Sequence, residues 1–169
     1  LYDAHIDYDI VPIDSVCGQA VVDQGKLRIG NGCFDCLLVP RAQYLPSAFL
    51  EQVRRLAGQG AKIWFLDGLP EAEGFAMPVV RLKDLADVMR TEEFVDVKVD
   101  GEFPFLRIYH ASRGKTQYWM LFNESTTQPV QTRMYTGHSG SYQQLDFLLD
   151  SVSEGVSELS LIHISEPTR

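Results

Sequence analysis

Hydrophobic residues between positions 34 and 70 alternate between short continuous runs and helical spacing. Residues 34–40 (FDCLLVP) are a short apolar run that ends at a proline, which is typical of a strand buried on both faces. Residues 45–60 (LPSAFLEQVRRLAGQG) place apolar side chains three and four positions apart, with a proline suited to the first turn and glycines that end the helix. Residues 61–70 (AKIWFLDGLP) form a second apolar run. Strand, helix and strand with short connections predict a βαβ unit with parallel strands and a right-handed crossover.

Two further patterns extend this unit. Residues 20–30 (AVVDQGKLRIG) predict a hairpin, because two apolar-rich runs flank Asp23, Gln24 and Gly25, and the glycine can take the positive φ that such a turn needs. Residues 79–90 (VVRLKDLADVMR) predict a short strand and another helix. Residues 1–94 are therefore expected to form an α/β domain with an open parallel sheet, flavodoxin-like in outline.

The pattern changes near residue 95. Residues 94–101 (FVDVKVDG) and 129–137 (PVQTRMYTG) alternate between apolar and polar positions with period two. Residues 103–125 predict two strands joined by a turn around Ser112 to Lys115. Successive short strands with Gly, Asn and Ser turns predict an antiparallel β-sandwich portion over residues 95–158. The fold class expected for the chain is thus α/β, a partial parallel sheet followed by an antiparallel β-sandwich portion.

Composition excludes several partners. Of the 169 residues, 45% are hydrophobic and 22% charged, the balance of a globular protein, and the formal net charge is -8. Such an acidic chain predicts no nucleic-acid partner, whose phosphates require a basic face, and no anionic membrane surface. No run approaches the ~20 apolar residues of a membrane helix.

The three cysteines do not predict a disulfide framework, a metal site or a redox cofactor. Cys33 and Cys36 have C-x-x-C spacing, but a structural zinc site needs about four ligands and the chain has no second such pair. A redox pair would follow a strand at the start of a helix, whereas Cys36 opens an apolar run. The interpretation favoured for Cys17, Cys33 and Cys36 is that of small buried hydrophobic residues.

Histidine and carboxylate side chains near the N-terminus raise a second metal question. His5, Asp7 and Asp9 alternate on a possible strand and could share one face, a ligand set that suits a metal ion. The alternative, which we favour, is a strand edge with polar side chains. No metal or other cofactor is therefore expected.

Three segments in order resemble the region after the catalytic barrel in large bacterial glycoside hydrolases of the alpha-L-rhamnosidase-like and beta-galactosidase-like kinds. Residues 5–16 (HIDYDIVPIDSV) and 25–70 resemble the class I amidotransferase-like α/β domain of these enzymes, with an extended Asp-Tyr-Asp segment, a Gly-rich hairpin and an apolar strand that ends in proline. Residues 105–125 (FLRIYHASRGKTQYWMLFNES) resemble the sandwich that follows. The resemblance covers most of residues 1–150.

The resemblance implies that the catalytic carboxylates lie on an upstream barrel outside this chain, so no catalytic residue is expected here. Four polar residues of the sandwich are candidates for hydrogen bonding between domains or, second, for direct contact with sugar: Arg107, His110, Asn123 and Glu124. Exposed aromatic rings would be needed for sugar stacking, and four rings are available: Tyr118, Trp119, Tyr135 and Tyr142. The alternation of residues 118–122 (YWMLF) is expected to place several of these rings in a core.

An amidotransferase-like fold also raises the question of a catalytic cysteine. A working amidotransferase carries its cysteine on a strained strand-to-helix turn with glycine two residues to either side. Around Cys33 these positions hold Asn31 and Asp35, and the cysteine precedes its predicted strand. We therefore expect only the fold to be shared.

The function expected from this resemblance is that of an accessory, non-catalytic fragment of a carbohydrate-active glycoside hydrolase, whose carbohydrate substrate is bound through the barrel. The alternative is a free-standing ligand-binding or carbohydrate-binding module without enzymatic activity. The resemblance leaves the cytoplasm and the periplasm of a bacterium both open, and it indicates no oligomeric state.

The last eleven residues have two interpretations. Residues 159–169 (LSLIHISEPTR) alternate like an edge strand, but all of them match the in-frame translation of a transposase adapter used to prepare DNA sequencing libraries. We expect this segment to be a non-native tail that makes few stabilising contacts. Together with leucine as the first residue, this tail leads us to expect that the chain is a fragment of a larger protein.

Overall fold

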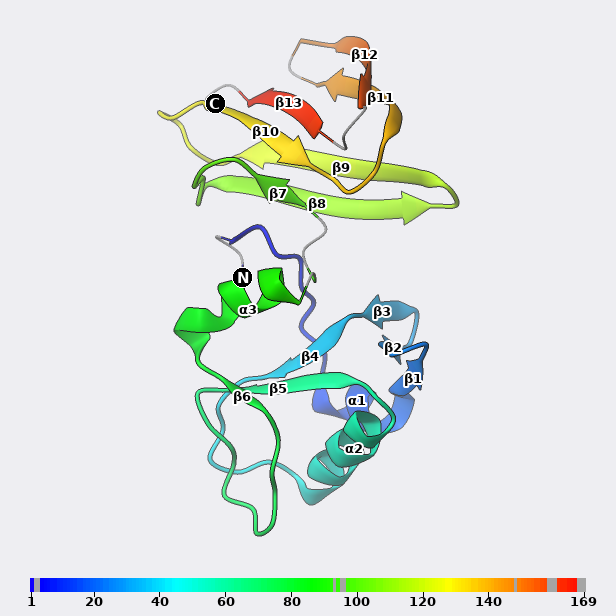
Figure 1. The fold of residues 1–169 in the computed structure, drawn as a ribbon, viewed down its shortest axis with the longest axis vertical. Helices are drawn as coiled ribbons and strands as arrows, with labels where there is room; N and C mark the ends of the chain where they lie inside the picture. The colour runs from blue at the N-terminus through cyan, green and yellow to red at the C-terminus, as the bar shows by residue number, and fades with distance from the viewer. Residues whose placement is uncertain (2–3, 93, 95–96, 148, 158–160, 167–169) are drawn as a thin grey trace. The chain divides into compact units, whose positions relative to one another are not determined.

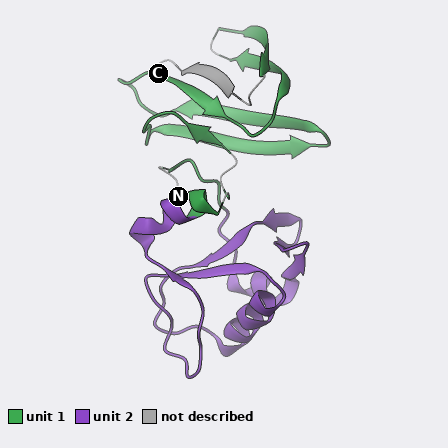
Figure 2. Cartoon of the chain, viewed as in Figure 1, with its two compact units in different colours: residues 1–8, 89–169 green, residues 9–88 purple. Residues whose placement is uncertain are grey.

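The computed structural model describes residues 1, 4–92, 94, 97–147, 149–157 and 161–166 (Figure 1). These residues form a mixed α/β structure with three α-helices and several small sheets, one parallel and the others antiparallel. The chain divides into two compact units (Figure 2). We call Asp9–Val88 the α/β unit, and Leu1–Tyr8 with Met89–Arg169 the β unit. The division falls a few residues before the predicted boundary, and the first eight residues group with the β unit.

The parallel sheet of the α/β unit contains β4 (Cys36–Val39), β5 (Lys62–Leu66) and β6 (Val79–Val80), in that order. β4 pairs with β5 in parallel, from Cys36 opposite Lys62 to Val39 opposite Phe65, and β5 pairs with β6 in the same sense. Helix α2 (Ser47–Gly58) connects β4 to β5. The predicted parallel strand–helix–strand unit is confirmed.

Helix α2 is amphipathic, and its ends follow from its sequence. Its buried face carries Phe49, Leu50, Val53 and Leu56, which join the core of this unit with residues of β2, β4 and β5. At its C-terminus Gly60 has φ 98° and donates its backbone N–H to the Ala57 carbonyl, while Ala61 donates to the Leu56 carbonyl. This pair of bonds is a Schellman motif, which satisfies carbonyls that the helix leaves unpaired.

The predicted hairpin is confirmed. β1 (Val21–Asp23) pairs with β2 (Lys26–Ile29), which also pairs with β3 (Gly32–Phe34), both antiparallel. Gln24 and Gly25 both have positive φ, 50° and 80°, as a two-residue type I′ turn requires.

The prediction of a strand that aligns His5, Asp7 and Asp9 is wrong. His5 lies in a turn with φ 56°, and residues 6–12 belong to no helix or strand. Helix α1 (Ile13–Gln19), which the sequence did not predict, begins directly after Pro12, whose carbonyl accepts hydrogen bonds from the N–H groups of Ser15 and Val16. The proline fixes a φ that suits a helix start and has no N–H to leave unpaired, which explains why the chain turns here.

The short strand and the helix predicted over residues 79–90 are confirmed. After β6, a short 3-10 helix η2 (Leu82–Asp84) leads into helix α3 (Leu85–Thr91). The division between the two units falls within α3.

The described residues of the β unit form three small antiparallel sheets. β8 (Leu106–Arg113) and β9 (Thr116–Asn123) form the predicted hairpin, with the turn at Gly114 and Lys115. β10 (Val130–Tyr135) lies between β7 (Lys98–Val99) and β13 (Leu161–Glu166). β11 (Gly140–Asp146) pairs with β12 (Ser151–Ser157).

The first two of these sheets share a core. β10 buries alternate residues, Val130, Thr132 and Met134, which confirms its predicted period of two. Val130 and Met134 pack in one cluster with Leu106, while Ile108 of β8 and Leu121 of β9 contact its edge. The β8–β9 hairpin therefore has an inner face that packs on β10 and an outer face that does not contribute to this core.

The expectation that residues 159–169 make few contacts is wrong for the described part of this segment. β13 pairs antiparallel with the whole of β10, from Val130 opposite Glu166 to Tyr135 opposite Leu161. The alternating sequence suits a strand, and β10 offers an edge to which it can bond. Residues 159, 160 and 167–169 lie outside the described residues.

Candidate functional site

Three of the four candidate polar residues gather at the open end of the β8–β9 hairpin. Arg107 forms an ion pair with Glu124, with 2.6 Å between Nη2 and Oε2. Its Nη1 donates to the Pro104 carbonyl at 2.6 Å and to the Leu106 carbonyl at 3.2 Å. The Arg107 side chain is only 10% exposed and that of Glu124 is 41% exposed. The guanidinium thus ties the chain before β8 to the residue after β9.

Asn123 closes the loop that follows β9. It is buried, its amide nitrogen donates to the Gln128 carbonyl at 2.8 Å, and its amide oxygen accepts the N–H of Ser125 at 2.9 Å. The Ser125 hydroxyl accepts the N–H of Gln128 at 2.9 Å. This is a side-chain network that replaces backbone pairing within a turn. Asn123 therefore has a structural role in this loop.

His110 lies apart from the other three. It is on the inner face of the hairpin, directly opposite Trp119, and the two rings stack with centroids 5.1 Å apart and planes 7° apart. Its Nε2 is 2.8 Å from the side-chain oxygen of Gln117. The ring of His138 tilts against both, at 6.3 Å from His110 and 5.7 Å from Trp119. The predicted set of four is therefore two groups, a loop anchor and an aromatic cluster.

The outer face of the hairpin carries side chains that sequence reasoning did not bring together. Pairing across the strands places eight residues on this face, which we call the outer face: Arg107, Tyr109, Ala111, Arg113, Thr116, Tyr118, Met120 and Phe122. Tyr109, Tyr118 and Met120 are 51%, 54% and 56% exposed. Large apolar side chains gathered in one exposed patch often mark a binding surface.

The other rings considered for sugar stacking are not on this face. Trp119 and Tyr142 contact the core cluster of the β unit. The Tyr135 hydroxyl lies 3.4 Å from a carboxylate oxygen of Asp100. Of the four rings named from the sequence, Tyr118 alone is on the outer face, and Tyr109 is the ring that was missed. The alternation of residues 106–113 contains that signal, since Tyr109 is two positions from Arg107.

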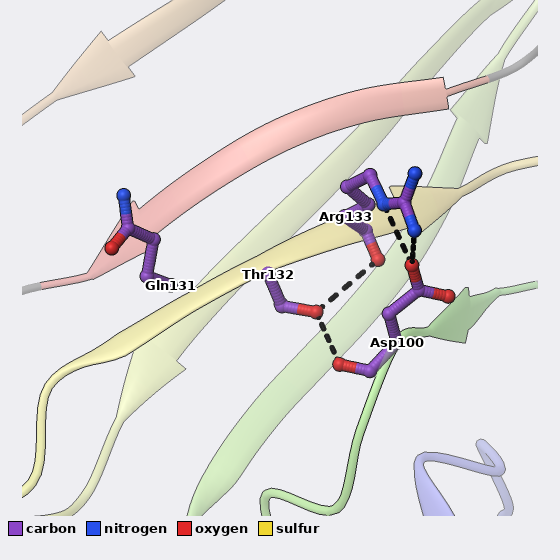
Figure 3. A pocket seen from close by; sticks show the side chains of 4 residues that line it. All are labelled: Asp100, Gln131, Thr132 and Arg133. Atoms are coloured by element: carbon purple, nitrogen blue, oxygen red, sulfur yellow. Dashed lines mark hydrogen bonds and ion pairs between the residues drawn. The ribbon is translucent and has the colours of Figure 1, made fainter.

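A hollow of about 380 Å³ lies beside β10 and β7, lined by Asp100, Gln131, Thr132 and Arg133 (Figure 3). Arg133 binds the Asp100 carboxylate through Nε at 2.7 Å and Nη2 at 2.6 Å. The Thr132 hydroxyl donates to the Asp100 carbonyl at 2.5 Å. Asp100, Thr132 and Arg133 thus bind one another, whereas Gln131 points away from them (Figure 3).

The residues considered for metal binding do not converge. Within the described part of the chain, no group of three or more His, Cys, Asp or Glu side chains is arranged to hold a metal ion. Asp9 belongs to the α/β unit, whereas His5 and Asp7 belong to the β unit, and the strand expected to align them does not form.

The expectation that the three cysteines are small buried residues is wrong for Cys33, which is exposed, while Cys17 and Cys36 are partly buried. Cys33 is exposed in the middle of β3, not at a strand-to-helix turn, whereas Cys36 is partly buried at the start of β4. Burial, with a smaller effect of the Asp35 carboxylate, raises the pKa of the Cys36 thiol to about 11, and Lys62 opposes this shift. The Cys36 thiol is therefore protonated at neutral pH and a poor nucleophile.

Comparison of the chain with protein-family models, with curated proteins and with solved structures found no match. Among the described helices, none is long and apolar enough to span a membrane.

Proposed function

We propose that this chain is a non-catalytic part of a carbohydrate-active glycoside hydrolase, in which the α/β unit is a partial flavodoxin-like domain and the β unit begins a β-sandwich. The observation that carries the proposal is the order of the two units. A parallel strand–helix–strand unit is followed by an antiparallel hairpin, and this hairpin holds the segment whose sequence resembles the post-barrel sandwich.

The carboxylates of the described residues support a non-catalytic role. Hydrolysis of a glycosidic bond requires two carboxyl groups, roughly 5 to 10 Å apart, that face the same bond. Here the carboxylates with described partners bind cations, backbone groups or side-chain amides of their own unit. Examples are Asp35 with Lys26, Glu124 with Arg107, and Asp67 with the N–H of Leu82.

The test compares this chain with a full-length parent. We expect the purified chain to release no product from aryl rhamnosides, galactosides or related glycosides, and a longer protein encoded by the same gene, with its barrel, to hydrolyse at least one of them. Turnover by the chain alone that disappears in a Glu124→Gln variant would contradict the non-catalytic role.

A free-standing carbohydrate-binding module is the second candidate, favoured by the half-exposed tyrosines of the outer face. The gene sequence upstream of Leu1 discriminates between the two. A barrel-coding region of several hundred residues supports the enzyme, and a start codon directly upstream supports the module. Failure of a full-length protein on every glycoside would also favour the module.

A further inference from the structure

The outer face of the β8–β9 hairpin is an ordered ladder of side chains. Tyr109 is directly opposite Met120, Tyr118 is opposite Ala111, and Arg113 is opposite Thr116. Tyr109 and Tyr118 are therefore diagonal neighbours, a relation that places side chains about 7–8 Å apart on one face of a sheet. Ala111 has only a methyl group and covers little of the Tyr118 ring, which agrees with the half-exposure of that ring. The hairpin thus presents two adjacent phenol rings to solvent.

The turn end of this ladder is cationic, although the whole chain has a net charge of -8. Arg113 and Lys115 are both exposed, and neither forms an ion pair with another described residue. Several other exposed cations are paired with a carboxylate of their own unit, namely Lys26, Arg28, Arg81 and Arg133. The turn therefore retains unneutralised positive charge next to Tyr118 and on the same face as Tyr109, and an anionic group complements it.

Tyrosine rings and a free guanidinium together recognise a specific chemistry. The electron-rich face of an aromatic ring attracts the weakly positive C–H groups of a sugar ring, and the phenol hydroxyl can bond a sugar hydroxyl. A guanidinium forms two parallel hydrogen bonds to a carboxylate. We propose that the outer face binds an acidic oligosaccharide, with sugar rings on Tyr109 and Tyr118 and a sugar carboxylate on Arg113.

The choice of a carbohydrate among anionic ligands rests on the proposed function. Nucleic acid has rings and negative charge as well, and the net charge of -8 opposes any polyanion at longer range, so the preference for a sugar over a nucleic acid is not made on charge. An acidic peptide would use the cations of the turn and gain less from two rings set side by side. These two ligands are outcomes that the test below separates.

The test measures binding by isothermal titration at low salt, with tetramers of galacturonate, glucuronate and mannuronate as probes. We expect the chain to bind at least one of them, and to bind the methyl ester of the same tetramer several-fold more weakly, because the ester keeps the rings and loses the charge. Affinity should fall as salt is added, as for an exposed charge pair.

Variants locate the site. Tyr109→Ala and Tyr118→Ala should each weaken binding of the acidic tetramer about tenfold, the loss typical of a contact residue that dominates an interface. Arg113→Gln should weaken binding of the acid by a similar factor and leave binding of the ester unchanged. Tyr44→Ala and Arg41→Gln are matched controls, since both residues are exposed in the α/β unit, and they should bind like the unmodified chain. Circular dichroism verifies that each variant is folded.

Three results would overturn the proposal. They are no binding of any acidic tetramer, equal binding by the tyrosine variants, and equal displacement of the tetramer by a poly-glutamate peptide or a single-stranded oligonucleotide. These results are independent of the hydrolysis assay of the full-length parent. The binding surface and the proposed function can therefore fail separately.

Discussion

Replacing Glu124 by glutamine tests whether the Arg107–Glu124 ion pair holds the open end of the hairpin. The variant keeps the shape of the side chain and removes its charge. The Arg107 side chain is 10% exposed, and its Nη2 is 2.6 Å from the lost carboxylate oxygen. Removing one partner of a fully buried pair costs about 3–5 kcal/mol, whereas an exposed pair contributes less than about 1 kcal/mol. Because Glu124 is 41% exposed, water replaces part of the lost interaction, and we expect a loss of about 1–2 kcal/mol.

The companion variant, Arg107→Met, also removes the hydrogen bond to the Pro104 carbonyl. We expect it to cost about 1–3 kcal/mol, the range for leaving a buried polar group unpaired. The two losses should not add, because both variants break the same ion pair. The coupling energy from the double variant should be about 1 kcal/mol.

The assay is urea unfolding followed by tryptophan fluorescence. The two tryptophans lie in different units, Trp64 in β5 and Trp119 in β9, so a Trp64→Phe background isolates the signal of the β unit. A Glu124→Gln variant as stable as its background, or a coupling energy of zero, would refute the anchor role. In that case hydrogen bonding between domains would again be the favoured role of these residues.

The remaining predictions concern the ends of elements and the thiols. Gly60→Ala should lower the free energy of unfolding by about 1–2 kcal/mol in urea unfolding, because φ 98° strains any L residue, whereas Gly58→Ala, inside the helix and equally free of steric contact, should raise it by about 0.5–1 kcal/mol. The raised pKa of the Cys36 thiol predicts that stability is fully present below pH 9 and falls as the pH rises toward 11, since the unfolded thiol loses its proton first; a Cys36→Ala variant should lack this loss in unfolding curves measured across that range. Mass spectrometry after limited alkylation at pH 8 should find Cys33 modified before Cys36. Deleting residues 159–169 removes a strand that pairs with β10, so the β unit should lose more than about 1 kcal/mol in the same urea assay, and unchanged stability would contradict this pairing.

The elements that could be predicted from the sequence are those whose signal is local. The helix over residues 47–58 has apolar residues at helical spacing, a proline before it and a glycine after it, and the structure follows all three signals. The hairpin at Gly25 and the longer hairpin at Gly114 likewise each have a turn residue with positive φ where the sequence places one. In such segments propensity, pattern and turn chemistry agree, which is the condition under which a sequence specifies its structure locally.

The predictions that were wrong concern segments whose local pattern fits two different structures. Residues 5–9 alternate like a strand, but a strand needs a partner, and none of the described strands pairs with this segment. Residues 161–166 alternate in the same way and do form a strand, because the edge of β10 accepts them. Period two in a sequence therefore predicts only the capacity to pair, and the partner decides the outcome.

The candidate site shows the same limit in side-chain chemistry. Arg107, Asn123 and Glu124 were candidates because the resemblance implies hydrogen bonding between domains, yet polar groups of this kind also have to satisfy the backbone wherever a hairpin opens into loops. In the structure, Arg107 and Asn123 bind carbonyls of their own loops, and Glu124 neutralises the arginine. Tyr118 was expected to be in a core because it belongs to an aromatic run, and Tyr109 was not considered for stacking. Strand geometry sends neighbouring side chains to opposite faces, so a run such as YWM must place some rings outward whenever it places others inward. A tyrosine ring that points outward does not have to satisfy a buried backbone group. Tyr109 and Tyr118 therefore remain available to a ligand, whereas the polar residues beside them already bind groups of their own unit.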